Sequence, residues 1–228
     1  MAKCSVEDQF DDVITYAVNE YGDHRHITRP KVIRWLTQFP AAHQQIAAKV
    51  LRSIDYYADN NIHAMAKSLA ATVYAEYNTT DKRRIWFVPI GDAGSGAQQV
   101  ARHLRTVRGV PKTCVVDLLT LHRGTAAEGD VVVAFDDFSG TGQAIRDWWD
   151  INETLVRPKQ ANLVLGVLVL NHKARKGLEE ITDLVMSVEE LHDEANVFHQ
   201  ACCAFRTEDK NALLELCRMT GCRGKYLK

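Results

Sequence analysis

The stretch VVVAFDDFSGTGQA, from Val131 to Ala144, indicates both the fold class and the site of this chain. It opens with an apolar run bounded by polar residues, which is the pattern of a buried β-strand. Two adjacent aspartates, Asp136 and Asp137, follow, and a segment rich in Ser, Gly and Thr then leads into residues that favour a helix. The order strand, polar turn and helix is the repeating unit of α/β proteins with a parallel sheet.

The polar residues after the apolar run are suited to a phosphorylated sugar. Backbone N–H groups at a helix N-terminus, together with the helix dipole, stabilise an anion such as phosphate. The carboxylates of Asp136 and Asp137 accept hydrogen bonds from neighbouring hydroxyls or hold a hydrated divalent cation. Strand–turn–helix units of this composition often bind nothing, but two adjacent acids repel each other unless something lies between them. The stretch therefore predicts a site for a sugar phosphate or nucleotide.

Composition excludes several other classes of protein. The chain has 228 residues and a formal net charge of −1, which argues against a general binder of nucleic acid or membrane surfaces. It contains no apolar run of membrane-spanning length and no secretory signal at its start, so we expect a cytoplasmic location and no membrane contact. The six cysteines predict neither a disulfide framework nor a zinc site, because their spacings do not match paired ligands.

The chain changes in pattern near residue 80. Apolar residues at helical spacing come first, and strands alternate with helices after that point. We therefore expect a single domain over 1–228, with a helical region at 1–79 and an α/β core at 80–228, in which a mostly parallel sheet is flanked by helices. Ligands of such sheets bind at the carboxyl ends of the strands, where the strand order reverses. The strands are expected at 85–90, 113–119, 131–135, 162–170 and 184–188.

A second glycine-rich turn follows the expected strand at 85–90. Its glycines allow the backbone to approach a ligand closely, and Ser95 is suited to cap the following helix. The turn is either a second phosphate-binding loop at the same edge of the sheet or a tight turn with a helix cap. The residues of this second loop are Gly91, Asp92, Ala93, Gly94, Ser95 and Gly96.

An apolar strand, two acids, three residues and Thr-Gly together resemble the binding motif for phosphoribosyl pyrophosphate (PRPP) in type I phosphoribosyltransferases. The resemblance implies that Asp136 and Asp137 hold the ribose hydroxyls and Mg²⁺. It also implies that the second loop binds the pyrophosphate. Many members of the family have a second Thr two positions after the Gly of the motif, where this chain has Ala144. The 5-phosphate would be wrapped by Phe138, Ser139, Gly140, Thr141 and Gly142, with the Thr141 hydroxyl as a donor.

The wider chain resembles a branch of phosphoribosyltransferase-like proteins from bacterial antiphage systems, some of them encoded beside retron reverse transcriptases. The segments RPKVIRWLTQFP, SIDYYADN and VPIGDAGSG precede the aspartate motif in that order. Partners implied by the resemblance are a reverse transcriptase complex with RNA and DNA, a DNA-binding protein, and further copies of the chain.

One departure from working phosphoribosyltransferases leaves the activity open. Their long mobile loop between the second and third core strands carries catalytic groups, whereas the gap from Thr120 to Asp130 is short. His122 and Arg123 are the candidate contacts there. Two hypotheses follow: an Mg²⁺-dependent effector that acts at ribose C1, or an inactive sensor or scaffold that binds protein or ribonucleoprotein partners. A plain salvage enzyme is disfavoured by the short gap and by the helical N-terminal region.

Overall fold

A computed structural model describes residues 5–25, 27–77, 84–156 and 161–219. The chain forms two compact units. One unit joins Met1–Ala58 to Asp193–Lys228, and the other is Asp59–His192. The units therefore do not divide near residue 80, where the composition changes, because the helix before that point packs on the sheet and the C-terminal helix packs with the N-terminal ones.

The unit from Asp59 to His192, here called the sheet unit, is built on four parallel strands in the order β1-β2-β3-β4. Val, Ile and Leu dominate these strands, and residues of this kind fit a sheet that is buried on both faces. The strands are β1 (Ile85–Pro89), β2 (Val131–Ser139), β3 (Asn162–Asn171) and β4 (Leu184–Leu191).

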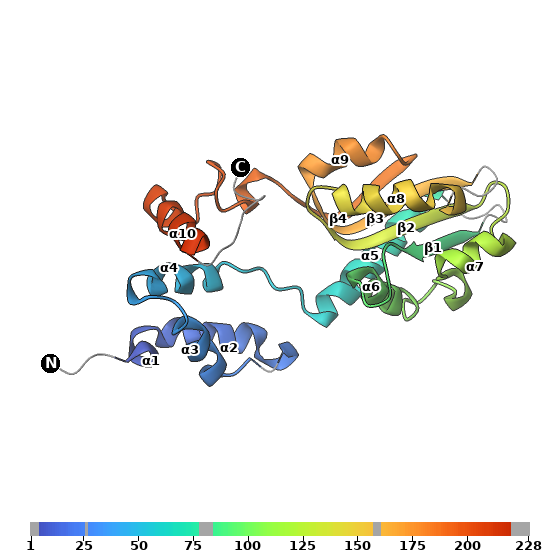
Figure 1. The fold of residues 1–228 in the computed structure, drawn as a ribbon. Helices are drawn as coiled ribbons and strands as arrows, with labels where there is room; N and C mark the ends of the chain where they lie inside the picture. The colour runs from blue at the N-terminus through green and yellow to red at the C-terminus, as the bar shows by residue number, and fades with distance from the viewer. Residues whose placement is uncertain (1–4, 26, 78–83, 157–160, 220–228) are drawn as a thin grey trace. The chain divides into compact units, whose positions relative to one another are not determined.

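Helices cover both faces of this sheet (Figure 1). On one face lie α5 (Asp59–Tyr77) and α6 (Gly96–Leu104), and on the other lie α8 (Gln143–Val156) and α9 (His172–Glu179). Strand residues alternate between the two faces, so neighbouring apolar side chains of β2 enter different cores. The α/β class with helices on both faces of a parallel sheet is confirmed.

The expected strand at 113–119 is wrong. The structure has a 3₁₀ turn at Lys112–Cys114, a single parallel bridge between Phe87 and Val115, and a short helix α7 (Leu118–Thr120). Asp117 ends the extended segment because its side chain caps α7 by accepting a hydrogen bond from the Thr120 N–H. Only the apolar pair after Cys114 is buried, which leaves too few residues for a full strand.

The bridge at Val115 still determines where the strand order reverses. Phe87 of β1 pairs with Val133 of β2 and also with Val115, so the Val115 segment and β2 lie on opposite sides of β1. After β1 the chain therefore forms the Val115 bridge on one side of β1, and it then forms β2 on the other side. Such a reversal opens a crevice at the carboxyl ends of the two strands, which here are β1 and β2.

Strand β2 is longer than expected. It continues past Phe135 to Ser139, because the ten-residue β3 provides partners for its last residues: Phe138 pairs with Val169 and Ser139 with Leu170. The expected end of the strand at residue 135 is therefore wrong, since both aspartates are strand residues. The turn that follows is confined to Gly140–Gly142.

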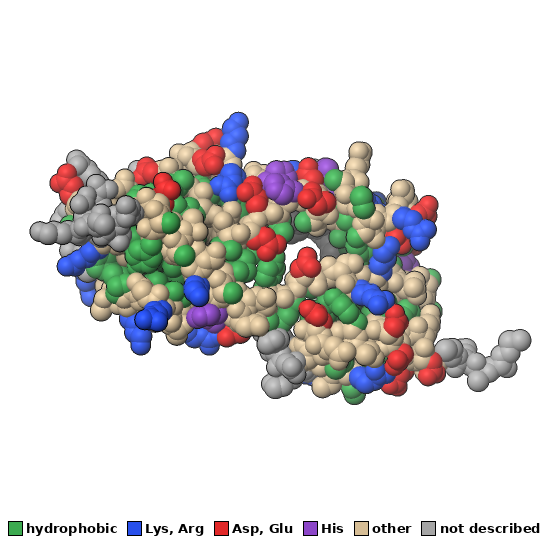
Figure 2. Space-filling model, turned by 180° about the vertical axis from the view of Figure 1, so that it is seen from behind, with side chains coloured by type: hydrophobic (Ala, Val, Ile, Leu, Met, Phe, Trp, Pro, Cys, Tyr) green, Lys and Arg blue, Asp and Glu red, His purple; other side chains and the backbone are tan. Residues whose placement is uncertain are grey.

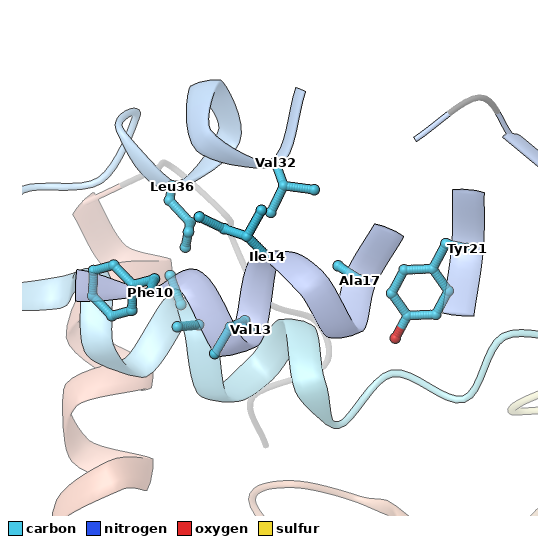
Figure 3. Close-up of a cluster of buried hydrophobic side chains, with 9 residues drawn as sticks. Phe10, Val13, Ile14, Ala17, Tyr21, Val32 and Leu36 are labelled. Carbon is cyan, nitrogen blue, oxygen red and sulfur yellow. The ribbon is translucent and has the colours of Figure 1, made fainter. Parts of the chain in front are cut away.

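The other unit is helical and has its own core. Figure 3 shows Ile14 of α2 and Leu36 of α3 packed with Phe10, which lies between α1 and α2. The hydroxyl of Tyr21 donates to the backbone oxygens of Leu51 and Ile54, 3.0 Å away in each case. Its helices are α1 (Val6–Gln9), α2 (Asp11–Arg25), α3 (Arg29–Leu36), α4 (Ala41–Arg52) and α10 (Thr207–Met219), with a 3₁₀ turn η3 at Asp193–Ala195.

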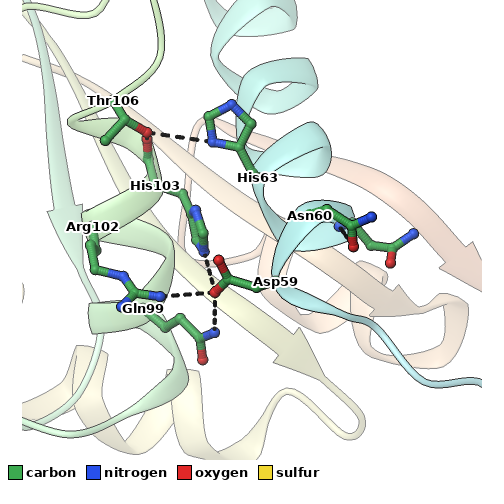
Figure 4. Close-up of polar contacts among 8 residues, drawn as sticks. Asp59, Asn60, His63, Gln99, Arg102, His103 and Thr106 are labelled. Carbon is green, nitrogen blue, oxygen red and sulfur yellow. Dashed lines mark hydrogen bonds and ion pairs between the residues drawn. The ribbon is translucent and has the colours of Figure 1, made fainter. Parts of the chain in front are cut away.

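A polar network joins the start of α5 to α6 within the sheet unit (Figure 4). One oxygen of Asp59 accepts hydrogen bonds from Gln99, Arg102 and His103, at 3.2, 2.8 and 3.1 Å. His103 is buried, so part of the basic sequence of α6 serves internal packing.

Over the face in Figure 2, side chains of both charges are visible, in keeping with the net charge of −1. None of the described helices is long and apolar enough to cross a membrane.

Candidate functional site

The two predicted loops lie at the same edge of the sheet. Strands β1 and β2 are neighbours, and the Ile90 N–H donates to the Phe135 oxygen at 2.9 Å, just where the strands give way to the loops. The second loop (91–96) leaves β1 at this edge, and the aspartate pair follows Phe135 on β2. The structure therefore brings Gly91–Gly96 together with Asp136 and Asp137 at the point where the strand order reverses.

The aspartate pair is partly buried and electrostatically strained. Burial, followed by the hydrogen bond and the repulsion from the Asp137 carboxylate, raises the pKa of Asp136 to about 7. The Asp137 N–H donates to an Asp136 carboxylate oxygen at 2.9 Å and acts in the opposite direction, but it does not outweigh these causes. A cation or hydroxyl donors bound at the pair would lower the free-energy cost of ionising Asp136.

The raised pKa predicts how the pair affects stability. The folded protein retains a proton on Asp136 that the unfolded chain releases near its ordinary pKa of 3.8, so this group's contribution to stability falls as the pH rises from about 4 to about 7. Asp136→Asn removes the free-energy cost of ionising this partly buried carboxyl group. Calorimetric melting should therefore show a larger gain for the variant at about pH 8 than at about pH 5. An equal gain at both pH values, or the same pH dependence in the exposed-site control Asp150→Asn, would contradict the assignment.

Asp137 of β2 contacts the end of the second loop directly. Its carboxylate lies against Gly96, so close that a Cβ on that glycine would overlap it. Gly96 is the first residue of α6, and Ser95 at the N-cap makes no side-chain hydrogen bond to the helix. A carboxylate at this position interacts favourably with the helix dipole. The glycine is therefore needed for close approach, as expected, but the group that approaches it is Asp137.

The predicted phosphate segment is divided between β2 and a short turn. Phe138 is 53% exposed, whereas Ser139 is 4% exposed and so is not a surface hydroxyl. Thr141 is exposed, and its hydroxyl oxygen accepts a hydrogen bond from the Gln143 N–H at 3.3 Å. Gly142 has a φ of 77°, a conformation that favours glycine, and it packs against Ala174 and Leu178 of α9. The N-terminus of α8 follows directly.

The second loop has the conformation of a glycine turn and an unexpected charge environment. Gly91 and Gly94 have φ values of 88° and 96°. Asp92, Ala93 and the two glycines are exposed. The loop borders a cavity of about 650 Å³, here called the α7–α8 cavity, which is also lined by Asp117, Leu118 and Leu119, by Trp148, Ile151 and Asn152 of α8, and by Pro89 and Gln98. Its described lining contains two acids and no Lys, Arg or His.

The remaining candidates lie apart from the aspartate pair. His122 and Arg123 are exposed on the turn η2 (Leu121–Thr125), which contacts α8, and the charge of Arg123 helps to lower the pKa of Asp117. Cys114, Cys202, Cys203 and Cys217 are free thiols, and Cys4 and Cys222 lie outside the described residues. Among the residues that the structure describes, no three His, Cys, Asp or Glu side chains are grouped to hold a metal.

The donor set of the pair nevertheless fits Mg²⁺ bound together with a ligand. Mg²⁺ prefers oxygen donors and is usually held by one or two carboxylates plus phosphates of the substrate and water. Asp136 and Asp137 supply two carboxylates at the edge of the sheet, and burial, with a contribution from the repulsion between them, raises the pKa of Asp136. A divalent cation shared with a phosphorylated ligand would remove that repulsion.

Comparison with protein families assigns the chain to one of them. A family model described as PRTase-CE matches residues 32–226. The chain belongs to the PRTase-CE family. PRTase denotes phosphoribosyltransferase, so the resemblance drawn from the aspartate motif is confirmed at the level of the family. The match spans parts of both compact units, so the helical unit belongs to the family's sequence pattern together with the sheet unit.

Solved structures similar to this PRTase-CE protein have low sequence identity. UMP synthase of Leishmania donovani is 16% identical with a TM-score of 0.41, and the match covers 70% of this chain and 33% of that one. The chain thus spans about a third of that enzyme. HGPRT-ase of Leishmania tarentolae, in complex with GMP, is 17% identical with a TM-score of 0.39 and coverages of 59% and 79%. Among curated proteins, the comparison finds no match.

The residues that the sequence did not indicate are those that line the α7–α8 cavity outside the second loop. Asp117, Trp148 and Asn152 come from a short helix cap and from one side of α8, and they meet only because α7 packs against α8. An aspartate followed by three residues of a short helix was a usable signal for the cap. No periodicity in the sequence links it to Trp148 or Asn152.

Proposed function

We propose that this PRTase-CE protein binds PRPP or a nucleotide, together with Mg²⁺, at the carboxyl ends of β1 and β2 and acts at ribose C1. The observation that carries the proposal is the position of Asp136 and Asp137, which follow the buried part of β2 beside a glycine turn at the reversal of strand order. The pair would orient the ribose hydroxyls and hold the cation, and the N-terminus of α8 after Gly142 would stabilise the 5-phosphate.

The chemistry that this geometry supports is departure of a group from C1 with positive charge developing on the ribose. Mg²⁺ would supply neutralisation of the phosphate charge of ligand and leaving group. The carboxylates of Asp136 and Asp137 would fix the ribose, and backbone N–H groups of the Gly140–Gly142 turn would hold the 5-phosphate. The test is release of pyrophosphate or free base from PRPP and nucleotides, measured for the wild-type protein and for Asp136→Asn with Asp137→Asn. Equal release by both would contradict a role of the pair in turnover.

A second candidate is a sensor or scaffold that binds the same ligand without turnover. The charge of the second loop favours it, because Asp92 is exposed there and the neighbouring cavity has no described Lys, Arg or His to stabilise a leaving pyrophosphate. A rise in melting temperature with PRPP and Mg²⁺, without release of any product, supports this candidate over the enzyme.

The biological setting that we propose is a bacterial antiphage system of the retron type. The order of the segments from Arg29 to Gly142 supports it, through the resemblance to the conflict-associated branch. In this setting the protein would be a cytoplasmic effector controlled by a reverse transcriptase–RNA/DNA complex and a DNA-binding partner. The test compares phage plating on cells carrying the gene with its neighbouring genes, with wild-type protein, with the double asparagine variant, and with Asp150→Asn. Full protection by the double variant would contradict an effector role of this site.

Gly96→Ala provides a separate test of how the two loops cooperate. The added methyl group overlaps the Asp137 carboxylate and must displace it, so the affinity for PRPP with Mg²⁺ should fall about tenfold by calorimetry. Gly177→Ala is the matched control, because its methyl group overlaps only the flexible end of Arg146. Unchanged affinity in Gly96→Ala would show that the position of Asp137 is not needed.

A further inference from the structure

The α7–α8 cavity has a composition that does not fit a phosphate. Asp92 and Asp117 bring two carboxylates to its lining, and the described lining residues include no Lys, Arg or His. Asp117 is held in place because it accepts a hydrogen bond from the Thr120 N–H at 2.7 Å, and this bond is the main reason that its pKa lies below the ordinary value. The Thr120 hydroxyl and the Leu119 N–H also contribute hydrogen bonds, and a carboxylate has about four acceptor positions, so Asp117 retains capacity for one further partner.

The same cavity has an exposed apolar rim. Leu119 is 56% exposed and Ile151 is 78% exposed, and both line the cavity. They are two of the five large hydrophobic residues that are exposed in the described part of the chain. Trp148 lines the cavity too, and Trp is the aromatic residue that interacts best with cations. Apolar surface with a few convergent polar groups is typical of a ligand site.

We propose that the α7–α8 cavity binds an organic cation, namely an ammonium, amidinium or guanidinium group carried on an apolar body. The carboxylates of Asp92 and Asp117 would pair with the charged group, and Leu119, Ile151 and Trp148 would contact the apolar body. The source is either a small molecule or an Arg or Lys side chain of a partner protein, since both present this chemistry. The proposal does not rest on the proposed function, but Gly91, Asp92 and Ala93 of the second loop line the cavity, so an occupant would touch that loop.

A matched series of probes tests the charge class. Benzamidine, benzamide and benzoate have the same ring with a cationic, a neutral and an anionic group. The indole N–H signal of Trp148 in NMR spectra, assigned with Trp148→Phe, reports on binding in the cavity. We expect a saturable shift with benzamidine, at least about tenfold weaker binding of benzamide, and none of benzoate. Benzoate binding as tightly as benzamidine would overturn the proposal.

Two variants locate the effect. Asp92→Asn with Asp117→Asn removes both charges, and asparagine still caps a helix. Benzamidine should then bind no better than benzamide does to the wild type, whereas the control Asp150→Asn on α8 should bind it normally. Ile151→Arg places a cation on an exposed rim position. Because this cation repels benzamidine, the affinity for benzamidine should fall to a similar extent. Unchanged benzamidine affinity in the Asp92, Asp117 variant would overturn the proposal.

A last pair of probes distinguishes the sources. N-acetyl-arginine N-methylamide imitates an arginine of a partner protein, and benzamidine imitates a small aromatic cation. Binding of the arginine derivative at least as tightly as benzamidine supports a protein side chain, binding of benzamidine alone supports a small ligand, and binding of neither overturns the proposal. Because PRPP with Mg²⁺ is titrated separately, its failure to bind would count against the proposed function and not against this cavity.

Discussion

Asparagine at both positions of the aspartate pair (Asp136→Asn with Asp137→Asn) should reduce the affinity for PRPP in the presence of Mg²⁺ by about 100-fold or more. The substitution keeps the size of both side chains but removes both charges, which are the groups suited to a cation and to ribose hydroxyls. Titration calorimetry at about pH 8, where Asp136 is ionised, measures the loss.

The same double variant should fold normally, which separates a loss of binding from a loss of structure. Removing the repulsion in the pair should leave the melting temperature without ligand unchanged or raised, because the pKa of Asp136 shows that its charge is costly. Asp150→Asn, on the exposed side of α8, is the control and should bind like the wild type. Normal PRPP affinity in the double variant would remove the basis of the proposed function.

Asp130→Ala should be among the most destabilising single substitutions in the sheet unit. The Asp130 side chain is buried and accepts hydrogen bonds from the Trp86 indole N–H at 2.8 Å, the Arg84 N–H at 3.0 Å and the Ala127 N–H at 2.9 Å. Alanine leaves these donors without their partner, at a cost of about 3 kcal/mol or more. The melting temperature should fall by roughly 6–12 °C.

Asp150→Ala controls for the loss of a carboxylate, since Asp150 is exposed, and it should change the melting temperature little. A small effect of Asp130→Ala, comparable to that of the control, would show that the three hydrogen bonds do not fix the start of β2. The prediction concerns folding alone and does not depend on any ligand.

The sequence was sufficient to predict most of the sheet unit. The strands β1 and β3 are strongly apolar, and turn residues bound them, so pattern alone indicated their positions. The prediction for 113–119 failed because its apolar residues satisfy a strand pattern, while the hydrogen bond from the Thr120 N–H to the Asp117 carboxylate favours a helix. Local hydrogen bonding of Asp therefore outweighed apolar composition there.

The sequence motif selected the candidate residues, but it did not give their arrangement. The motif identified Asp136 and Asp137, yet the length of β2 depends on pairing with β3, which only the fold provides. The contact between Asp137 and Gly96 joins residues far apart in the chain, as do the contacts between Asp117 and α8 that form the cavity. Amino-acid composition does not predict these contacts, because they form only when separate helices and strands pack together.

The most direct test of a phosphorylated ribose site at β1 and β2 is the melting temperature of the wild-type protein with and without PRPP and Mg²⁺. A ligand at about 100 times its dissociation constant stabilises the folded state by about 2.7 kcal/mol. For a protein of this size the melting temperature should then rise by roughly 5–10 °C, and pyrophosphate alone should give a smaller rise. No rise with PRPP or with any nucleotide, at saturating Mg²⁺ and about pH 8, would contradict the site.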